Sequence, residues 1–273
     1  MGLAPTVQAE GWQFTQTKGL DMKGEWKRRI RNGRRAKEEG GIMADLAQEN
    51  PVLAALATCA LGFVKDGDIV GLGTGHAATT FVRALGRRVR EGLRVTGVPT
   101  SAATAVAAQE CGIPLVGLDD LDGIDVTVDG ADEVDPHLDL IKGYGGAMVG
   151  EKIVAAASRT EIILVGNDKL VPVLGQRGIL PVEVIPFAVG FCKRRLASLG
   201  CRPQVRMVEG RPFISDSGNY VLDCGIEPIT NPQQLEDMIR AIPGVVGTGL
   251  FLGIADVVLV GESDAVRAIR RER

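Results

Sequence analysis

The residue types and spacing in the middle of the chain are those of a proton-transfer site. Asp129, Asp132 and Glu133 follow a short apolar stretch, 126–128, whose pattern predicts a buried strand. Carboxylates crowded in this way raise one another's pKa, so that one of them can hold or accept a proton near neutral pH. The next loop carries Lys142, nine residues after Glu133. Acids at a strand end and a cation on a loop favour an enzyme that acts on a small anionic substrate.

Glycines surround Lys142 and lead into a predicted helix. Gly143, Gly145 and Gly146 leave the loop backbone free to donate N–H groups to a ligand. Glu151 stands at the predicted start of the helix, where the helix dipole stabilises a carboxylate unless a ligand intervenes. Two other interpretations of the acids stay open, a magnesium site and a solvated turn without function.

A second glycine-rich turn, at 71–76, joins a predicted strand to a predicted helix. Its sequence is Gly-Leu-Gly-Thr-Gly-His; the glycines let a ligand approach the backbone, and the free N–H groups of the helix favour a phosphate. It is not a strict dinucleotide fingerprint, since position 78 is alanine, and no Walker lysine follows. A tight turn without a ligand is the alternative. Thr100, Ser101 and Thr104 end the next strand, where hydroxyls either bind sugar oxygens or cap a helix.

The elements that must position these loops alternate between strands and helices. Such alternation predicts an α/β fold with a doubly wound parallel sheet. The predicted strands are 69–72, 94–98, 114–116, 126–128, 162–165 and 256–260, and the predicted helices are 45–65, 77–89, 101–111, one from Glu151, and 263–270 capped by Ser263 or Asp264.

A smaller unit interrupts this pattern after Pro181. Its predicted elements are a strand at 182–185, a helix at 187–199, a hairpin of 204–215 and 220–223, a helix at 232–241 and an extended segment at 245–251. This β-α-β-β-α-β order is the ferredoxin-like split βαβ unit. We therefore predict an α/β catalytic domain, 44–177 plus 249–273, with an inserted α+β domain at 178–248.

Composition limits the function classes. The 273 residues carry a net charge of −3, which gives no argument for a nucleic-acid or membrane partner. Apolar runs are broken well before the roughly 20 residues that a spanning helix needs. The five cysteines are scattered and histidines number only two, so reduced thiols in a cytoplasmic protein are expected rather than disulfides or a zinc site.

Residues 1–43 differ from the rest in having little apolar periodicity and a basic run at 27–37. A disordered tail, a targeting segment and a start site placed too far upstream are the three interpretations. The segment has no apolar core of secretory length, and its acidic residues argue against a transit peptide. We predict a disordered extension that takes no part in the chemistry.

Taken together, these motifs resemble the type A ribose-5-phosphate isomerase family. The similarity runs in order from about residue 44 to the end of the chain. The matching segments are Gly-Leu-Gly-Thr-Gly at 71–75, Val-Pro-Thr-Ser at 98–101 with Thr104, Asp-Gly-Ala-Asp-Glu at 129–133, Lys-Gly-x-Gly-Gly-Ala at 142–147, Glu151-Lys152, Lys169, Leu-Pro-Val-Glu-Val-Ile-Pro at 180–186 and Ile-Pro-Gly-Val-Val at 242–246. The acidic motif followed by the lysine loop is the most specific of them.

The resemblance implies interconversion of ribose 5-phosphate and ribulose 5-phosphate through a cis-enediolate, in a cytoplasmic homodimer without a metal or other cofactor. It makes Glu151 the base that moves a proton between C2 and C1. It gives Asp129 a part in ring opening and in proton transfer at the sugar oxygens, with Asp132 beside it. Lys142 and loop N–H groups would stabilise the enediolate oxygen. The substrate-binding residues that the resemblance implies are Gly73, Thr74, Gly75, His76, Ala77, Gly130, Ala131, Gly143, Gly145, Gly146 and Lys169.

The chain departs from the family's pattern at the phosphate end of the site. His76 and Ala77 stand where the family usually has Ser-Thr, and the segment 51–55 has no lysine where the family often places one. Gly166 replaces an aspartate, and Tyr144 replaces a glycine. Since the acids and Lys142 are kept, we expect intact chemistry with a weaker phosphate grip or a somewhat different phosphosugar.

Two alternatives to the isomerase are a related sugar-phosphate enzyme of the same fold, such as an amino-sugar phosphate deaminase, and a phosphosugar-binding sensor without turnover. The acidic motif and Pro-Val-Glu-Val at 181–184 favour the isomerase over the first. Retention of Glu151, Asp129 and Lys142 argues against the second, because binding alone does not need all three.

Overall fold

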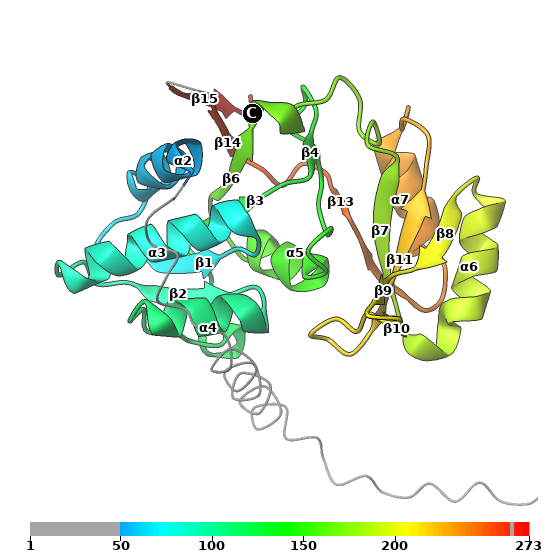
Figure 1. The fold of residues 1–273 in the computed structure, drawn as a ribbon, viewed down its shortest axis with the longest axis horizontal. Helices are drawn as coiled ribbons and strands as arrows, with labels where there is room; N and C mark the ends of the chain where they lie inside the picture. Colours follow the sequence, from blue (N-terminus) through cyan, green and yellow to red (C-terminus); the bar gives the residue numbers. More distant parts are fainter. Residues whose placement is uncertain (1–49, 263–264, 273) are drawn as a thin grey trace, which may run out of the picture.

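A six-stranded sheet forms the larger part of the computed structural model, which describes residues 50–262 and 265–272 (Figure 1). Its strand order is β15-β14-β6-β3-β1-β2, with all neighbours parallel except β15, which is antiparallel to β14. The strands are β1 (Ile69–Leu72), β2 (Thr96–Pro99), β3 (Val126–Gly130), β6 (Glu161–Gly166), β14 (Val257–Gly261) and β15 (Val266–Arg270).

Helices and a small sheet cover the two faces of this large sheet. On one face α2 (Pro51–Leu61) and α3 (His76–Arg90) bury Leu56, Phe81 and Leu85 against the strands. On the other lie α5 (Met148–Ala156) and a three-stranded sheet of β4 (Glu133–Val134), β5 (Leu140–Ile141) and β13 (Leu250–Phe251). The fourth helix of this part, α4 (Ala102–Glu110), packs beside β2 and α3. Coverage of both faces confirms the predicted doubly wound α/β architecture.

A separate four-stranded antiparallel sheet, at the right of Figure 1, has the order β12-β7-β11-β8. It consists of β7 (Ile179–Val184), β8 (Arg202–Val205), β11 (Tyr220–Gly225) and β12 (Val245–Thr248), with α6 (Val189–Ser198) and α7 (Pro232–Arg240). Val182, Leu196 and Ile239 lie in its core. The β-α-β-β-α-β order predicted for this segment is therefore present. A small hairpin of β9 (Met207–Val208) and β10 (Arg211–Pro212) extends from it.

Capping side chains explain where several helices start. Asn50 accepts the N–H of Val52 at 2.9 Å at the start of α2, and Ser101 accepts that of Thr104 at 3.1 Å at the start of α4. In contrast, no side chain in the described part of the chain caps α3, which follows Gly75 at a φ of 108°. Its first N–H groups therefore remain available to a ligand.

The predicted helix at 263–270 is wrong. The segment 266–270 is strand β15, hydrogen-bonded to β14, while the proposed caps Ser263 and Asp264 lie outside the described residues. Val266 and Ile269 stand three residues apart and are half-buried, which imitates helical spacing. Pairing with the free edge of β14 overrides this weak local pattern.

Other boundaries also differ from the predictions. The predicted strand 114–116 is only an isolated bridge between Leu115 and Gly97. The hairpin arm predicted at 204–215 is split into β8, β9 and β10, and the segment 245–251 is divided between β12 and β13 in two sheets. The first helix is 51–61 rather than 45–65, of which 45–49 lies outside the described residues, as does the whole extension 1–43.

Candidate active site

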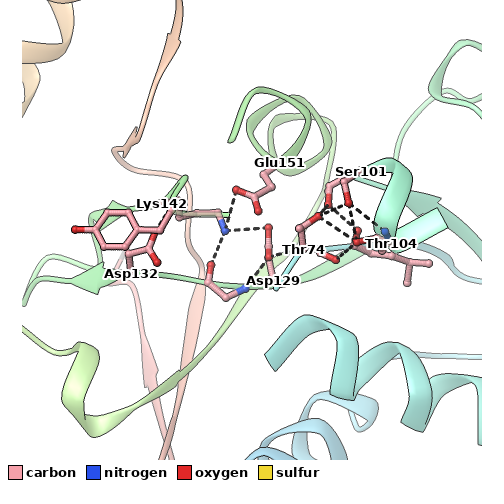
Figure 2. A network of polar contacts seen from close by, with 12 residues as sticks. Thr74, Ser101, Thr104, Asp129, Asp132, Lys142 and Glu151 are labelled. Carbon is pink, nitrogen blue, oxygen red and sulfur yellow. Dashed lines mark hydrogen bonds and ion pairs between the residues drawn. The ribbon is translucent and has the colours of Figure 1, made fainter. Parts of the chain in front are cut away.

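Lys142 lies at the centre of a buried cluster of charges (Figure 2). Its Nζ is 3.0 Å from Oδ2 of Asp129 and 3.3 Å from Oε2 of Glu151, and it donates a hydrogen bond to the carbonyl of Gly130 at 2.5 Å. Asp129 is 1% exposed, Lys142 2% and Glu151 4%. The lysine loop, strand β3 and helix α5 thus each contribute one charge to a site shielded from solvent.

Local backbone geometry brings these three side chains together. The helix α5 begins at Met148, three residues before the predicted start, so Glu151 lies in its first turn and not at its first position. The loop before it bends at Gly143, with a φ of 104°, and at Gly146, with a φ of 82°. A Cβ on Gly143 would lie 2.8 Å from Sδ of Met148, so only glycine lets the loop pack on the helix.

Burial and the two neighbouring charges set the protonation of Glu151. Burial raises its pKa to about 8, and the negative charge of Asp129 adds to this, while the Lys142 ammonium opposes it. Burial alone would lower the pKa of Lys142, but the attraction of Asp129 and Glu151 outweighs it and raises that pKa. The cluster therefore joins a carboxyl that titrates near neutral pH to a permanent cation.

Two further acids belong to the surroundings of the cluster. Burial raises the pKa of Asp132, although its Oδ2 accepts the N–H of Tyr144 at 3.0 Å. Glu161, on β6, is buried, and burial raises its pKa well above the usual range. Among residues 50–262 and 265–272, its Oε2 has no hydrogen-bond partner. Sequence reasoning did not single out Glu161; the only signal is an acid at the first position of an apolar strand.

A cavity of about 780 Å³ opens beside the cluster. Twelve of the predicted site residues line it: Thr74, Gly75, His76, Ala77, Gly130, Ala131, Asp132, Lys142, Gly143, Gly145, Glu151 and Lys169. It is also lined by residues outside the predicted set, including Asn167, Asp168 and Glu262, and by Asn50, Val52 and Leu53 at the start of α2, where the family often places a lysine within the segment 51–55. The helix α2 reaches the cavity only through tertiary packing, which no local motif reveals.

Three predicted residues, Asp129, Gly73 and Gly146, lie behind the cavity wall. A Cβ on Gly73 would be 2.2 Å from Oδ1 of Asp129, and one on Gly146 would be 2.4 Å from the Phe213 ring. These glycines therefore allow close packing of the loops, and Asp129 contacts the cavity through the side chain of Lys142.

The predicted hydroxyls form a cluster that ties two loops together (Figure 2). Oγ1 of Thr74 lies 2.8 Å from the hydroxyls of both Thr100 and Ser101 and 3.1 Å from that of Thr104. The backbone N–H of Thr74 donates to Oδ1 of Asp129 at 3.1 Å. The glycine-rich turn is thus held against both β2 and β3, which fixes the start of α3.

The part of the cavity wall at the start of α3 suits an anion. His76 and Ala77 line it at the uncapped start of α3, where backbone N–H groups and the helix dipole favour negative charge. Within the described residues, the lysines that line the cavity are Lys142 and Lys169. The first turn of α2 presents Val52 and Leu53 instead of a lysine. The arrangement can abstract a proton at the Glu151 carboxylate and hold an anionic group at the start of α3.

Comparison with known proteins gives a consistent result. The sequence profile described as ribose 5-phosphate isomerase A (phosphoriboisomerase A) matches residues 96–265. A ribose-5-phosphate isomerase A from Roseiflexus castenholzii is 49% identical over 210 residues, which cover 76% of this chain and 90% of the relative.

Two solved structures are similar over the same region. The ribose 5-phosphate isomerase A from Methanocaldococcus jannaschii is 40% identical, with a TM-score of 0.78, and covers 82% of this chain and 100% of its own. A D-ribose-5-phosphate isomerase in complex with phospho-erythronic acid is 39% identical, with a TM-score of 0.79 and the same coverage.

Proposed function

Since the chain belongs to the ribose 5-phosphate isomerase A family, we propose that its Glu151–Lys142–Asp129 cluster catalyses the interconversion of D-ribose 5-phosphate and D-ribulose 5-phosphate. The observation that carries this assignment is the buried ion pair between Lys142 and Glu151 at the wall of a cavity that is also lined by the uncapped start of α3. A base and a cation on the same side of a bound sugar are what an aldose–ketose isomerase needs.

Glu151 moves the proton between carbons. Its carboxylate takes the proton from C2 of the open-chain aldose, and the resulting carboxylic acid returns it to C1. In the same sequence the C2 hydroxyl becomes the ketone and the C1 aldehyde becomes the hydroxymethyl group. A pKa near 8 serves both halves of this transfer, because the group is neither too weak a base nor too weak an acid near neutral pH.

Lys142 stabilises the intermediate between the two transfers. Loss of the C2 proton places negative charge on the sugar oxygens of a cis-enediolate. The Lys142 ammonium is held in place before that charge forms, by Asp129 and the carbonyl of Gly130. A cation that needs no rearrangement in a site shielded from water lowers the energy of this state more than that of the neutral sugar.

The two aspartates act at the sugar oxygens. Asp132 lines the cavity, and its raised pKa suits proton transfer during ring opening and between O1 and O2. Asp129 lies behind the wall and acts with it, chiefly by holding Lys142. Ring opening, which the family resemblance assigns first to Asp129, is therefore proposed for the pair, with Asp132 in contact with the sugar.

The start of α3 and Lys169 bind the phosphate. The ligand of one solved relative, phospho-erythronic acid, carries by its name a phosphate and a carboxylic acid. The cavity offers a partner for each anionic end, α3 with Lys169 for the phosphate and Lys142 for the other. This pairing supports the same orientation for ribose 5-phosphate.

We further propose that the reaction uses no metal ion, since Lys142 occupies the place of a Lewis acid beside the reacting oxygens.

A cytoplasmic homodimer is proposed from the family resemblance. No helix among the described residues is long and apolar enough to cross a membrane. The domain division at residues 178 and 248 is proposed from the separate four-stranded sheet of that segment.

The proposed reaction is tested by incubating the purified chain with ribose 5-phosphate in deuterium oxide. We expect ribulose 5-phosphate with deuterium at C1, because a proton carried by a carboxylate exchanges with solvent. Deuterium at C1 would exclude a direct hydride shift from C2 to C1, and binding without conversion would favour the phosphosugar sensor.

The contribution of the start of α3 to phosphate binding is tested by changing Ala77 to threonine. A hydroxyl at this position of α3 would donate to the phosphate, and a hydrogen bond to a charged group contributes about 1.5–3 kcal/mol, so we expect KM for ribose 5-phosphate to fall by about tenfold or more. The control is Ala77→Val, which has the shape of threonine without the hydroxyl. Equal KM values in the two variants would show that the hydroxyl does not reach the phosphate.

A further inference from the structure

Arg206 extends from the four-stranded sheet to the lysine loop, residues 142–147. It lies between β8 and β9, and its backbone is hydrogen-bonded within this part of the chain, to Val221 at 2.9 Å and to Phe213 at 2.8 Å. Its side chain is only 13% exposed. An arginine buried to this degree needs partners for its N–H groups.

The guanidinium of Arg206 has two sets of partners. On one side, Nε and Nη2 donate to the two carboxylate oxygens of Asp223 at 3.0 and 2.5 Å. On the other, Nη1 donates to the carbonyl of Gly143 at 2.9 Å and to that of Tyr144 at 3.1 Å. Asp223 thus orients the planar guanidinium group, which in turn donates hydrogen bonds to two consecutive carbonyls of the lysine loop.

The peptides held by Arg206 are connected to the residues that face the sugar. Gly143 directly follows Lys142, and its carbonyl also accepts the N–H of Gly146 at 3.0 Å, which closes the turn of the loop. The N–H of Tyr144 donates to Oδ2 of Asp132 at 3.0 Å. Any rotation of these peptides would therefore displace the partner of Asp132 and the backbone that carries Lys142.

A ring contact completes this connection. The guanidinium carbon of Arg206 lies 5.8 Å from the centre of the Phe213 ring. The same ring packs on Gly146, where a Cβ would be 2.4 Å from it. Phe213 and Arg206 together therefore hold the lysine loop between the four-stranded sheet and α5.

We propose that Arg206 is a positioning residue for catalysis, which fixes the lysine loop so that Asp132 and Lys142 meet the sugar oxygens in the reactive geometry. This inference rests on the isomerase function proposed above. A lysine cannot replace this arginine, because an ammonium group lacks the planar fork that binds a carboxylate and two carbonyls at once.

The proposal is tested by steady-state kinetics of Arg206→Met and Arg206→Lys on ribose 5-phosphate. We expect kcat to fall by about 10- to 100-fold in both variants, since small displacements of reacting groups have effects of this size. KM should change less than kcat, because the side-chain hydrogen bonds of Arg206 go to Asp223 and to the backbone of the lysine loop rather than to the residues proposed for phosphate binding. The matched control is Arg202→Met on β8, whose partner is Glu227 at the surface, and it should keep full activity.

A double-mutant cycle separates positioning from loss of stability. If Arg206 acts through Asp132, the drop in kcat caused by Arg206→Met should be much smaller in an Asp132→Asn background. Melting temperatures confirm that each variant is folded during the assay.

Unchanged kcat in a folded Arg206→Met variant, full recovery in Arg206→Lys, or an equal fold-loss in both backgrounds would overturn the proposal. Absence of turnover in the unmodified chain would instead refute the isomerase function itself.

Discussion

Replacing Glu151 by glutamine is expected to lower kcat for ribose 5-phosphate by about 10²- to 10⁴-fold, the range that a general base contributes. The amide has nearly the same shape as the carboxyl group but cannot take the proton from C2. Glu151 is 4% exposed and 3.3 Å from Lys142, so the site should keep its form and the substrate should still bind.

The matched control for this variant is Glu161→Gln. Glu161 is equally buried, and burial raises its pKa well above the usual range, which favours the neutral carboxyl group that the amide resembles. It does not line the cavity, and we expect nearly native kcat. Similar losses in both variants would mean that any buried acid near the cluster matters, and that Glu151 is not the base.

The same assignment predicts the pH dependence of kcat/KM. The base must be ionised, and its pKa in the free enzyme is about 8, so kcat/KM should fall tenfold for each pH unit below that value. Measurements between about pH 6.5 and 9.5 lie above the second ionisation of a phosphate ester, which is about 6, and therefore report the enzyme. A flat profile over this interval would exclude a base with a raised pKa.

Much of the site is predictable because parallel strands end at a common edge. Thr74 follows β1, Thr100 and Ser101 follow β2, and Asp129 ends β3, so recognising each strand locally is enough to bring these residues together. The apolar stretches of these strands are short but bounded by glycine or polar residues, which makes them visible in one sequence.

The position of Lys142 is not predictable in the same way. Its loop follows β5, a two-residue strand that pairs with Leu250 and Phe251, more than a hundred residues further along the chain. Strands of this length have no periodicity of their own, and their register is decided by pairing, here with β4 on one side and with the distant β13 on the other. The same holds for Arg206, whose contact with the loop depends on how the four-stranded sheet packs against the part of the protein that carries the loop.

Glu161 shows another limit of sequence reasoning. Its register partner on β3 is Thr127, two residues before Asp129, which places it on the face of the sheet that is covered by α5. Burial of this acid is a property of the completed fold, since a glutamate at the start of a strand is exposed in most sequence contexts.

Replacing Lys142 by methionine is expected to reduce kcat by about 10²- to 10³-fold, the effect of removing one stabiliser of an oxyanion. Loss of the ammonium leaves the enediolate charge without its nearest cation. The substitution also raises the pKa of Glu151 further, because in the native protein the Lys142 ammonium lowers that pKa. The pH at which kcat/KM reaches half of its maximum should therefore be higher in the variant than in the native protein. A general loss of folded enzyme would not change this pH.

Stability will change together with activity in this variant, because Asp129 is 1% exposed and would lose its ion-pair partner. Breaking a buried ion pair by removing one partner costs about 3–5 kcal/mol. The double variant Asp129→Asn with Lys142→Met removes the stranded charge and should regain most of the melting temperature without regaining activity. Recovery of kcat in the folded double variant would show that Lys142 serves only to neutralise Asp129, and that another group stabilises the enediolate.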